Sequence, residues 1–225
     1  MEDLRIIKVP VSAARDHDYF ARPREPLVTF AAQQSIQGEV IDFGCASGLL
    51  GARLRQLPGI SRVTGVELDG ASVEAARSNL DCVIHGSLTD DQTWEQLPLK
   101  VGAIVFADVL EHLEFPGTVL ARAAKLLNAG GWAIISVPNV NHYRVVASLV
   151  LRGEWEYTDF GVLDRTHLRF YTTKSAVRLV TDADLVLRDT AVPLAPRSAT
   201  LGRFSHTSRR FLASQTFIAA QRPSG

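Results

Sequence analysis

The sequence predicts an α/β fold in which a doubly wound, mostly parallel sheet of seven strands has helices on both faces. Short apolar segments rich in β-branched residues alternate with segments whose apolar residues recur at helical spacing, which indicates βαβ units. The segment 101–108, VGAIVFAD, is apolar almost throughout, as expected of a strand covered on both faces. No long helix separates the last two predicted strands, 185–192 and 214–221, so we expect them to be antiparallel, with the C-terminal strand at an edge.

Local signals place the boundaries of the individual elements. The first helix of the alternating region stops at Pro58-Gly59, and Asp69 or Ser72 can cap the next one. Pro116 suits the first turn of a helix that the run 128–131, NAGG, terminates. In chain order, the predicted strands are 39–43, 62–68, 82–86, 101–108, 132–139, 185–192 and 214–221, and the predicted helices are 49–57, 72–80, 90–97, 116–128 and 173–180.

The length of 225 residues, without a repeat or low-complexity tract, predicts a single domain. We divide it into an N-terminal arm (1–38), a Rossmann-like core (39–139), an irregular insert or lid (140–172) and a C-terminal helix with two strands (173–225).

Composition excludes several classes of protein. Lys+Arg and Asp+Glu both number 24, so the net charge is zero and indicates neither a nucleic-acid nor a membrane surface; the basic cluster 203–210 reads as a solvated loop. Cys45 and Cys82 lack the spacing of a disulfide framework or zinc site. The N-terminus has no signal-peptide pattern, and the apolar run 145–151 is too short to span a membrane. We therefore expect a cytoplasmic protein.

The stretch VIDFGCASG (40–48) predicts a ligand-binding loop at the end of the first core strand. Ligands of open α/β sheets bind at the carboxyl ends of the strands. A dinucleotide fingerprint lacks its third glycine here, because a leucine stands at that position, and no Gly-Lys-Ser/Thr of a phosphate-binding loop follows. What remains is an acid-x-Gly-x-small-x-Gly pattern formed by Asp42, Gly44, Ala46 and Gly48; a tight strand–helix turn would give the same pattern.

This pattern resembles motif I of the class I S-adenosylmethionine-dependent methyltransferases, and the segment 106–139 resembles their fourth-to-fifth-strand region. A loop without bulk would let the amino-acid end and ribose of the cofactor lie against the backbone. Glu67, nineteen positions after Gly48, has the spacing of an acid that accepts both ribose hydroxyls. Where the family often carries an acid for the adenine amino group, this chain has Ser87, a weaker acceptor. The remaining predicted cofactor contacts are Arg24, which could pair bidentately with the cofactor carboxylate, and Leu68 and Ala107.

Two further segments, 17–31 and 161–172, resemble bacterial methyltransferases associated with glycosyltransferases in polysaccharide biosynthesis. A second likeness is to a methyltransferase-like protein associated with methionine biosynthesis, and ubiquinone-type O-methyltransferases are a more distant one. These resemblances imply that the methyl acceptor is a small molecule or a sugar, but they do not identify it.

Methyl transfer to a hydroxyl requires removal of one proton, and histidine suits that role near neutral pH. The candidates are His167 in the insert, which we favour, and His112 after the fourth strand. We expect Asp164 and Arg165 to form a structural pair. The segment from Asp108 to His112 resembles a divalent-metal segment of ubiquinone-type enzymes, but we predict no metal, because the segment is common in relatives without one.

The sequence therefore predicts an S-adenosylmethionine-dependent methyltransferase that modifies a hydroxyl of a small molecule, sugar or glycan by in-line transfer. The alternative is an S-adenosylmethionine-binding, non-catalytic partner or regulatory subunit. An NAD-dependent oxidoreductase is disfavoured by the missing third glycine. We expect no nucleic-acid partner and no membrane span, and the sequence does not indicate an oligomeric state.

Overall fold

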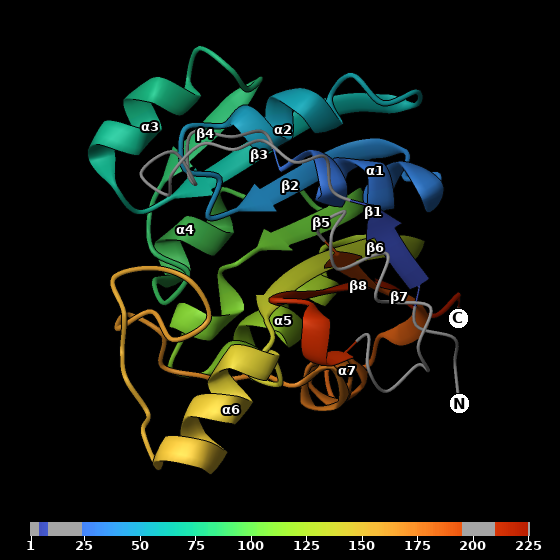
Figure 1. Ribbon diagram of the computed structural model, residues 1–225. Helices are drawn as coiled ribbons and strands as arrows, with labels where there is room; N and C mark the ends of the chain where they lie inside the picture. The colour runs from blue at the N-terminus through green and yellow to red at the C-terminus, as the bar shows by residue number, and fades with distance from the viewer. Residues whose placement is uncertain (1–4, 9–23, 195–209, 225) are drawn as a thin grey trace.

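A computed structural model describes residues 5–8, 24–194 and 210–224. Within these residues, eight strands form one sheet in the order β1-β7-β8-β6-β5-β2-β3-β4 (Figure 1). The elements are β1 (Arg5–Lys8), α1 (Glu25–Gln33), β2 (Gly38–Phe43), α2 (Leu49–Leu54), β3 (Ile60–Glu67), α3 (Gly70–Ala76), β4 (Cys82–His85), α4 (Asp91–Glu95), β5 (Val101–Ala107), the 3-10 turn η2 (Leu110–His112), α5 (Pro116–Ala124), β6 (Leu127–Pro138), α6 (Tyr143–Arg152), α7 (Thr173–Thr181), β7 (Val186–Leu194) and β8 (Gln215–Gln221).

The predicted fold class is confirmed. Strands β2 to β6 pair in parallel, and β8 is antiparallel to both β6 and β7. The C-terminal strand is not at an edge, however, because β8 lies between β6 and β7 and is almost entirely buried there. The sequence analysis did not predict β1, which adds a short parallel strand next to β7 at the edge of the sheet.

Helices cover both faces of the sheet (Figure 1). Residues of α1, α2 and α3 pack with one core cluster, and residues of α4, α5 and α7 pack with the other. Alternation along β2 divides its side chains between the two, so Val40 faces the first cluster while Ile41 and Phe43 face the second. Asp42 therefore shares the face of Val40 and lies against Gly51 of α2.

The sequence predicted an irregular insert over 140–172, but this segment contains the helix α6. This helix has no buried residue and ends at Gly153, whose φ of 69° lies in the left-handed region. The returning chain is anchored to the core at η2, where the backbone N–H groups of Leu168 and Arg169 both donate to the Glu111 carbonyl oxygen, at 2.8 and 3.0 Å.

Two stretches used in the sequence arguments, 17–23 and 203–209, lie outside the described residues. In the part of the chain that is described, every helix is too short or too polar to cross a membrane.

Candidate functional site

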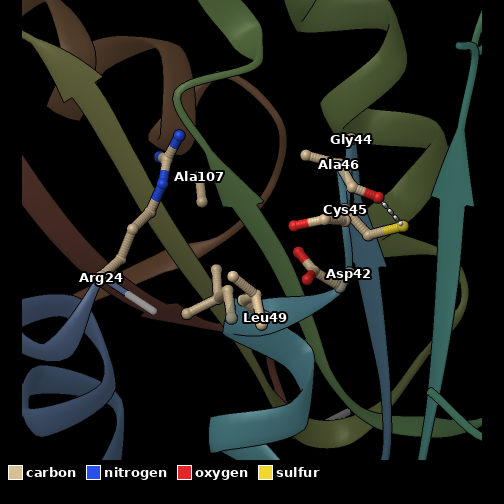
Figure 2. A pocket seen from close by; sticks show the side chains of 9 residues that line it. Arg24, Asp42, Gly44, Cys45, Ala46, Leu49 and Ala107 are labelled. Carbon is tan, nitrogen blue, oxygen red and sulfur yellow. Dashed lines mark hydrogen bonds between the residues drawn. The ribbon is translucent and has the colours of Figure 1, made fainter. Parts of the chain in front are cut away.

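An open cavity of about 560 Å³ lies at the carboxyl ends of β2, β3, β4 and β5. The chain turns away in opposite directions from β2 and β5 here, which makes this the switch point at which open α/β sheets bind ligands. A much smaller pocket of about 20 Å³ shares part of its wall (Figure 2). The large cavity is lined by Arg24, Gly44, Ala46, Val66, Glu67, Leu68, Ser72, Gly86, Ser87, Leu88, Ala107, Asp108, Val109, His112 and Leu113.

The loop after β2 lacks large side chains for two reasons, which are its backbone conformation and the close approach of Val109. Gly44 has a φ of +66°, and a Cβ atom there would lie 2.6 Å from Val109 Cγ2. Ala46 also has a positive φ, +47°, a conformation that costs an L-residue about 1–2 kcal/mol. The close approach of the segment after β5 thus explains Gly44 even before any ligand is considered.

Glu67 holds this loop in place. Its Oε2 accepts a hydrogen bond from Ala46 N at 2.8 Å, and its Oε1 accepts from Leu68 N and Asp69 N at 2.8 and 2.9 Å. A carboxylate has about four acceptor sites, so capacity remains for a ligand hydroxyl in the cavity that Glu67 lines. The sequence predicted the ligand contact and missed the bridge to the loop.

Gly48 was predicted to contact the cofactor, but it lines neither cavity. It is the N-cap of α2, with a φ of +79°, and a Cβ atom would lie 3.0 Å from Leu80 Cγ and 3.2 Å from Ala76 Cα. Close packing of the loop against α3 and the residues after it therefore requires this glycine.

Asp42 and Arg24 approach the smaller pocket from opposite sides (Figure 2). The Asp42 side chain is buried, and neither of its carboxylate oxygens makes a hydrogen bond of good geometry among the described residues, although the backbone N–H of Gly51 lies close enough to favour the ionised form. Burial raises its pKa from 3.8 to about 7; Arg24 opposes this rise and Glu67 adds to it. An unpaired buried carboxyl that lines a pocket is a feature expected of a binding site.

Asp108 joins three separate parts of the chain at the cavity wall. Its carboxylate accepts hydrogen bonds from Arg24 Nη1 at 2.8 Å, Gln215 Nε2 at 2.6 Å and Ser136 Oγ at 2.8 Å. The backbone of Asp108 has a φ of +55°, in the left-handed region. The sequence carried no signal for Ser136 or Gln215, because nothing local connects them to the end of β5.

The remaining predicted cofactor residues all line the large cavity. Leu68 is 67% exposed there, so it offers an apolar surface that a planar group could cover. Ala107 ends β5 without bulk. Ser87 Oγ lies 2.7 Å from Thr89 Oγ1 and accepts from Thr89 N, which uses part of its hydrogen-bonding capacity.

The two candidate bases come together, and of the two only His112 lines the cavity. His112 lines the cavity, whereas His167 lies behind it and is buried; their ring centroids are 4.8 Å apart. His112 Nδ1 donates to the Thr166 carbonyl oxygen at 3.3 Å, and His167 Nδ1 donates to that of Val162 at 3.2 Å. A carbonyl can only accept, so in the neutral form of His112 the lone pair is on Nε2. Burial, together with the neighbouring His167, lowers the pKa of His112, which favours its neutral form.

Glu111, His112 and His167 offer potential metal-ligand atoms that all lie within 4.8 Å of one another. Glu111 is fully buried, its carboxylate oxygens have no partner within the described chain, and burial, reinforced by Asp108, raises its pKa. Asp108, the first acid of the segment noted in the sequence, is instead bound by Arg24, Ser136 and Gln215. The three residues could hold a divalent cation, and the prediction of no metal stays a prediction.

The expected pair between Asp164 and Arg165 is wrong. Arg165 Nη2 lies 2.8 Å from Asp159 Oδ1, while Asp164 Oδ1 accepts from both N and Oγ1 of Thr166. Asp164 thus fixes the turn that carries Thr166, which contacts His112.

A loop without large side chains, an acid at the end of the next strand and an arginine opposite a buried carboxyl define an α/β protein with a ligand site at the switch point of its sheet. Comparison with known families matches residues 15–190 to the family described as a methyltransferase domain. The chain belongs to this family of S-adenosylmethionine-dependent methyltransferases.

Sequence relatives include two enzymes of ubiquinone biosynthesis. The O-methyltransferase of Nitrosomonas europaea is 28% identical over 134 residues, which cover 54% of this chain and 56% of that protein. The mitochondrial O-methyltransferase of Candida albicans is 30% identical over 105 residues, which cover 44% of this chain and 32% of that protein. The matches thus span about half or less of the length of these curated relatives.

Solved structures show the same fold. An S-adenosylmethionine-dependent methyltransferase from Archaeoglobus fulgidus aligns with a TM-score of 0.63 at 12% identity, over 91% of this chain and 96% of that one. An O-methyltransferase family protein from Burkholderia thailandensis aligns with a TM-score of 0.63 at 19% identity, over 92% of this chain and 58% of that one.

The residues present fit S-adenosylmethionine. The unpaired Asp42 carboxyl and the Arg24 guanidinium suit the charged amino and carboxylate groups of its amino-acid end, and Glu67 retains acceptor capacity for the ribose.

We predict that Gly44→Ala destabilises the protein and abolishes cofactor binding. The added methyl group meets Val109 in a conformation unfavourable for L-residues. The matched control is Gly153→Ala, whose φ of +69° is similar but whose Cβ position has nothing within 4 Å. It should lower stability by about 1–2 kcal/mol and leave cofactor binding intact. Thermal unfolding and calorimetry check both variants; normal binding by Gly44→Ala would show that the loop is not the cofactor site.

A second prediction concerns pH. The folded protein binds the Asp42 proton more tightly than the unfolded chain does, so this group stabilises the fold at low pH and the contribution is lost as pH rises through about 7. Between about pH 5 and pH 8, the unfolding free energy of the wild type should fall by about 2–3 kcal/mol relative to Asp42→Asn. Denaturant titrations of both proteins at both pH values measure this. If the unfolding free energies of the wild type and Asp42→Asn change equally with pH, the pKa of Asp42 is not raised.

Proposed function

We propose that this methyltransferase transfers a methyl group from S-adenosylmethionine to a hydroxyl group of a small acceptor, with His112 as general base. The observation that carries the proposal is that His112 lines the same cavity as the loop after β2 and Glu67. The similarity to two proteins named as O-methyltransferases supports oxygen as the acceptor atom.

Four residues would hold the cofactor. Arg24 and Asp42 would bind its amino-acid end, Glu67 a ribose hydroxyl, and Leu68 would lie against its base. The bound cofactor supplies an electrophilic methyl group on a sulfonium sulfur. The loop from Gly44 to Ala46 would let the cofactor reach the backbone between β2 and β5.

His112 would take the proton of the acceptor hydroxyl on Nε2. Its Nδ1–H is held by the Thr166 carbonyl oxygen, which leaves the Nε2 lone pair available. The lowered pKa keeps the ring neutral and ready to accept a proton at pH 7. His167 packs edge-on against His112 and would act by positioning it rather than by touching the acceptor.

The glycan acceptor implied by the sequence resemblance stays a prediction. A panel that contains phenols, sugars and nucleotide sugars, assayed for release of S-adenosylhomocysteine, separates the acceptor classes. Cofactor binding without turnover on any acceptor would instead favour the non-catalytic alternative.

We predict that Glu67→Ala weakens cofactor binding by at least ~10²-fold. The substitution would remove one charge-assisted hydrogen bond to the ribose, worth about 1.5–3 kcal/mol, and also the bond to Ala46 N that holds the loop after β2. The neighbouring acid provides the control: Asp69 caps α3 through Ser72 N at 2.8 Å, so Asp69→Ala should cost about 1 kcal/mol of stability with little change in affinity. If calorimetry gives the wild-type affinity for a folded Glu67→Ala protein, Glu67 does not bind the ribose.

Replacing the base should lower turnover and spare cofactor binding. We expect His112→Ala to reduce the turnover number ~10²–10⁴-fold, because the ground-state complex does not need the base. His167→Ala should have a smaller effect. Wild-type turnover should also fall as pH drops through the His112 pKa, below 6.5.

His142, a half-buried histidine at the N-cap of α6, lines neither cavity and is the matched control; His142→Ala should keep turnover. A larger loss in His167→Ala than in His112→Ala would restore His167 as the base. A loss below tenfold in both variants would exclude a histidine base.

A further inference from the structure

Three side chains from distant parts of the chain meet at the Asp108 carboxylate, and two of them line no cavity. Asp108 Oδ2 accepts hydrogen bonds from Arg24 Nη1 at 2.8 Å and Gln215 Nε2 at 2.6 Å, and Oδ1 accepts from Ser136 Oγ at 2.8 Å. Arg24 lines both the large cavity and the smaller pocket, whereas Ser136 and Gln215 line neither. Any effect of Ser136 or Gln215 on ligand binding must therefore pass through Asp108.

Asp108 is held in a backbone conformation that its surroundings must maintain. Its φ of +55° lies in the left-handed region, which a residue other than glycine keeps only where neighbouring contacts determine it. Asp108 N donates to the Ser136 carbonyl oxygen at 3.1 Å, so Ser136 binds both the backbone and the side chain of Asp108. The Asp108 side chain is only 8% exposed. The direction of its carboxylate is thus set by β6 and β8.

Gln215 is also fixed in place, because it begins β8 and pairs there with Pro138 of β6. Asn139, which is buried directly after β6, ties down the residues that precede β8. Its backbone N donates to the Ser214 carbonyl oxygen at 2.8 Å, and its Nδ2 donates to the Ala213 carbonyl oxygen at 2.9 Å. The Gln215 amide is therefore delivered to Asp108 by a rigid part of the fold.

The bond to Asp108 gives the Arg24 side chain a direction before any ligand binds. Figure 2 shows this side chain extending from the start of α1 towards Ala107, on the opposite side of the pocket from Asp42. A free arginine side chain has many rotamers, so fixing it in advance lowers the entropic cost of binding. A guanidinium carries five N–H donors in a planar fork, and one bond at Nη1 sets the plane of that fork without using all of its donors.

We propose that Asp108, Ser136 and Gln215 form a bracket that aims Arg24 at the carboxylate of the cofactor's amino-acid end, so that all three are positioning residues. This rests on the proposed placement of that end beside Arg24 and Asp42. It assigns the affinity for one part of the cofactor to residues of β6 and β8, which lie far from the loop after β2 in the sequence. A ligand that lacks the amino-acid end should be insensitive to the bracket.

The test is calorimetric titration of the full chain with S-adenosylhomocysteine and with 5′-methylthioadenosine, which keeps the nucleoside and the thioether but lacks the amino-acid end. Gln215→Met retains a side chain of similar shape without its donor. It should weaken the binding of S-adenosylhomocysteine about tenfold, because a charge-assisted hydrogen bond to Asp108 is lost. The affinity for 5′-methylthioadenosine should change by less than about threefold. Ser136→Ala should show the same selectivity.

Two further variants separate positioning from a general effect on the fold. Gln221→Met is the matched control at the other end of β8, where Gln221 Nε2 donates to the Gly130 carbonyl oxygen at 3.2 Å; it should leave both affinities unchanged. In an Arg24→Met background, Gln215→Met should have no further effect on S-adenosylhomocysteine, since residues that act through one another are not additive. Thermal unfolding checks that each variant is folded.

The proposal fails if folded Gln215→Met and Ser136→Ala proteins weaken both ligands equally or leave the affinity for S-adenosylhomocysteine unchanged. It also fails if Gln215→Met keeps its full effect in the Arg24→Met background. A selective loss of S-adenosylhomocysteine binding in Arg24→Met alone would then show that the amino-acid end is correctly placed and that only the bracket is wrong. If Arg24→Met weakens neither ligand, the placement of the cofactor is wrong and this proposal fails with it.

Discussion

The bridge from the Glu67 carboxylate to the loop after β2 is the interaction on which the cavity depends. Parallel pairing brings the ends of β2 and β3 together, and Gly44 N and Cys45 N still donate to the Val66 carbonyl oxygen of β3, but Ala46 lies beyond this pairing. One carboxylate accepts backbone N–H groups from the segments that follow both strands, and such charge-assisted bonds are stronger than neutral ones. They offset the unfavourable backbone conformation of Ala46 and hold the loop open towards the cavity.

The Asp108 carboxylate likewise holds the opposite wall of the cavity through hydrogen bonds. It binds residues from the start of α1, from β6 and from β8, so the cavity is completed by segments that are distant in sequence. Both acids end parallel strands, where strand ends converge and a ligand can approach. Asp42 and Glu111 differ from them, because each is buried without a partner among the described residues. The two acids that shape the walls thus have hydrogen-bond donors, whereas the Asp42 carboxyl lines a pocket without one.

Alternating apolar segments were enough to predict the strands and helices of the core, because burial on two faces imposes a pattern that short windows reveal. The insert was harder. The run 145–151 reads equally as a strand or a helix, and α6 gains no burial that would mark one face. The place of β8 between β6 and β7 depends on its pairing with β6, which lies more than seventy residues earlier in the chain and for which the sequence has no local signal.

By itself the sequence determined the class of fold, the bare loop and the acid on the next strand, because these depend on residue type at fixed local spacing. Tertiary structure alone decided the roles within the site. Gly48 serves packing rather than a ligand because α3 lies against it, and His112 rather than His167 borders the cavity because the insert folds back onto the Glu111 carbonyl. Such roles depend on which distant segments meet, and side-chain chemistry at one position does not specify its neighbours in space.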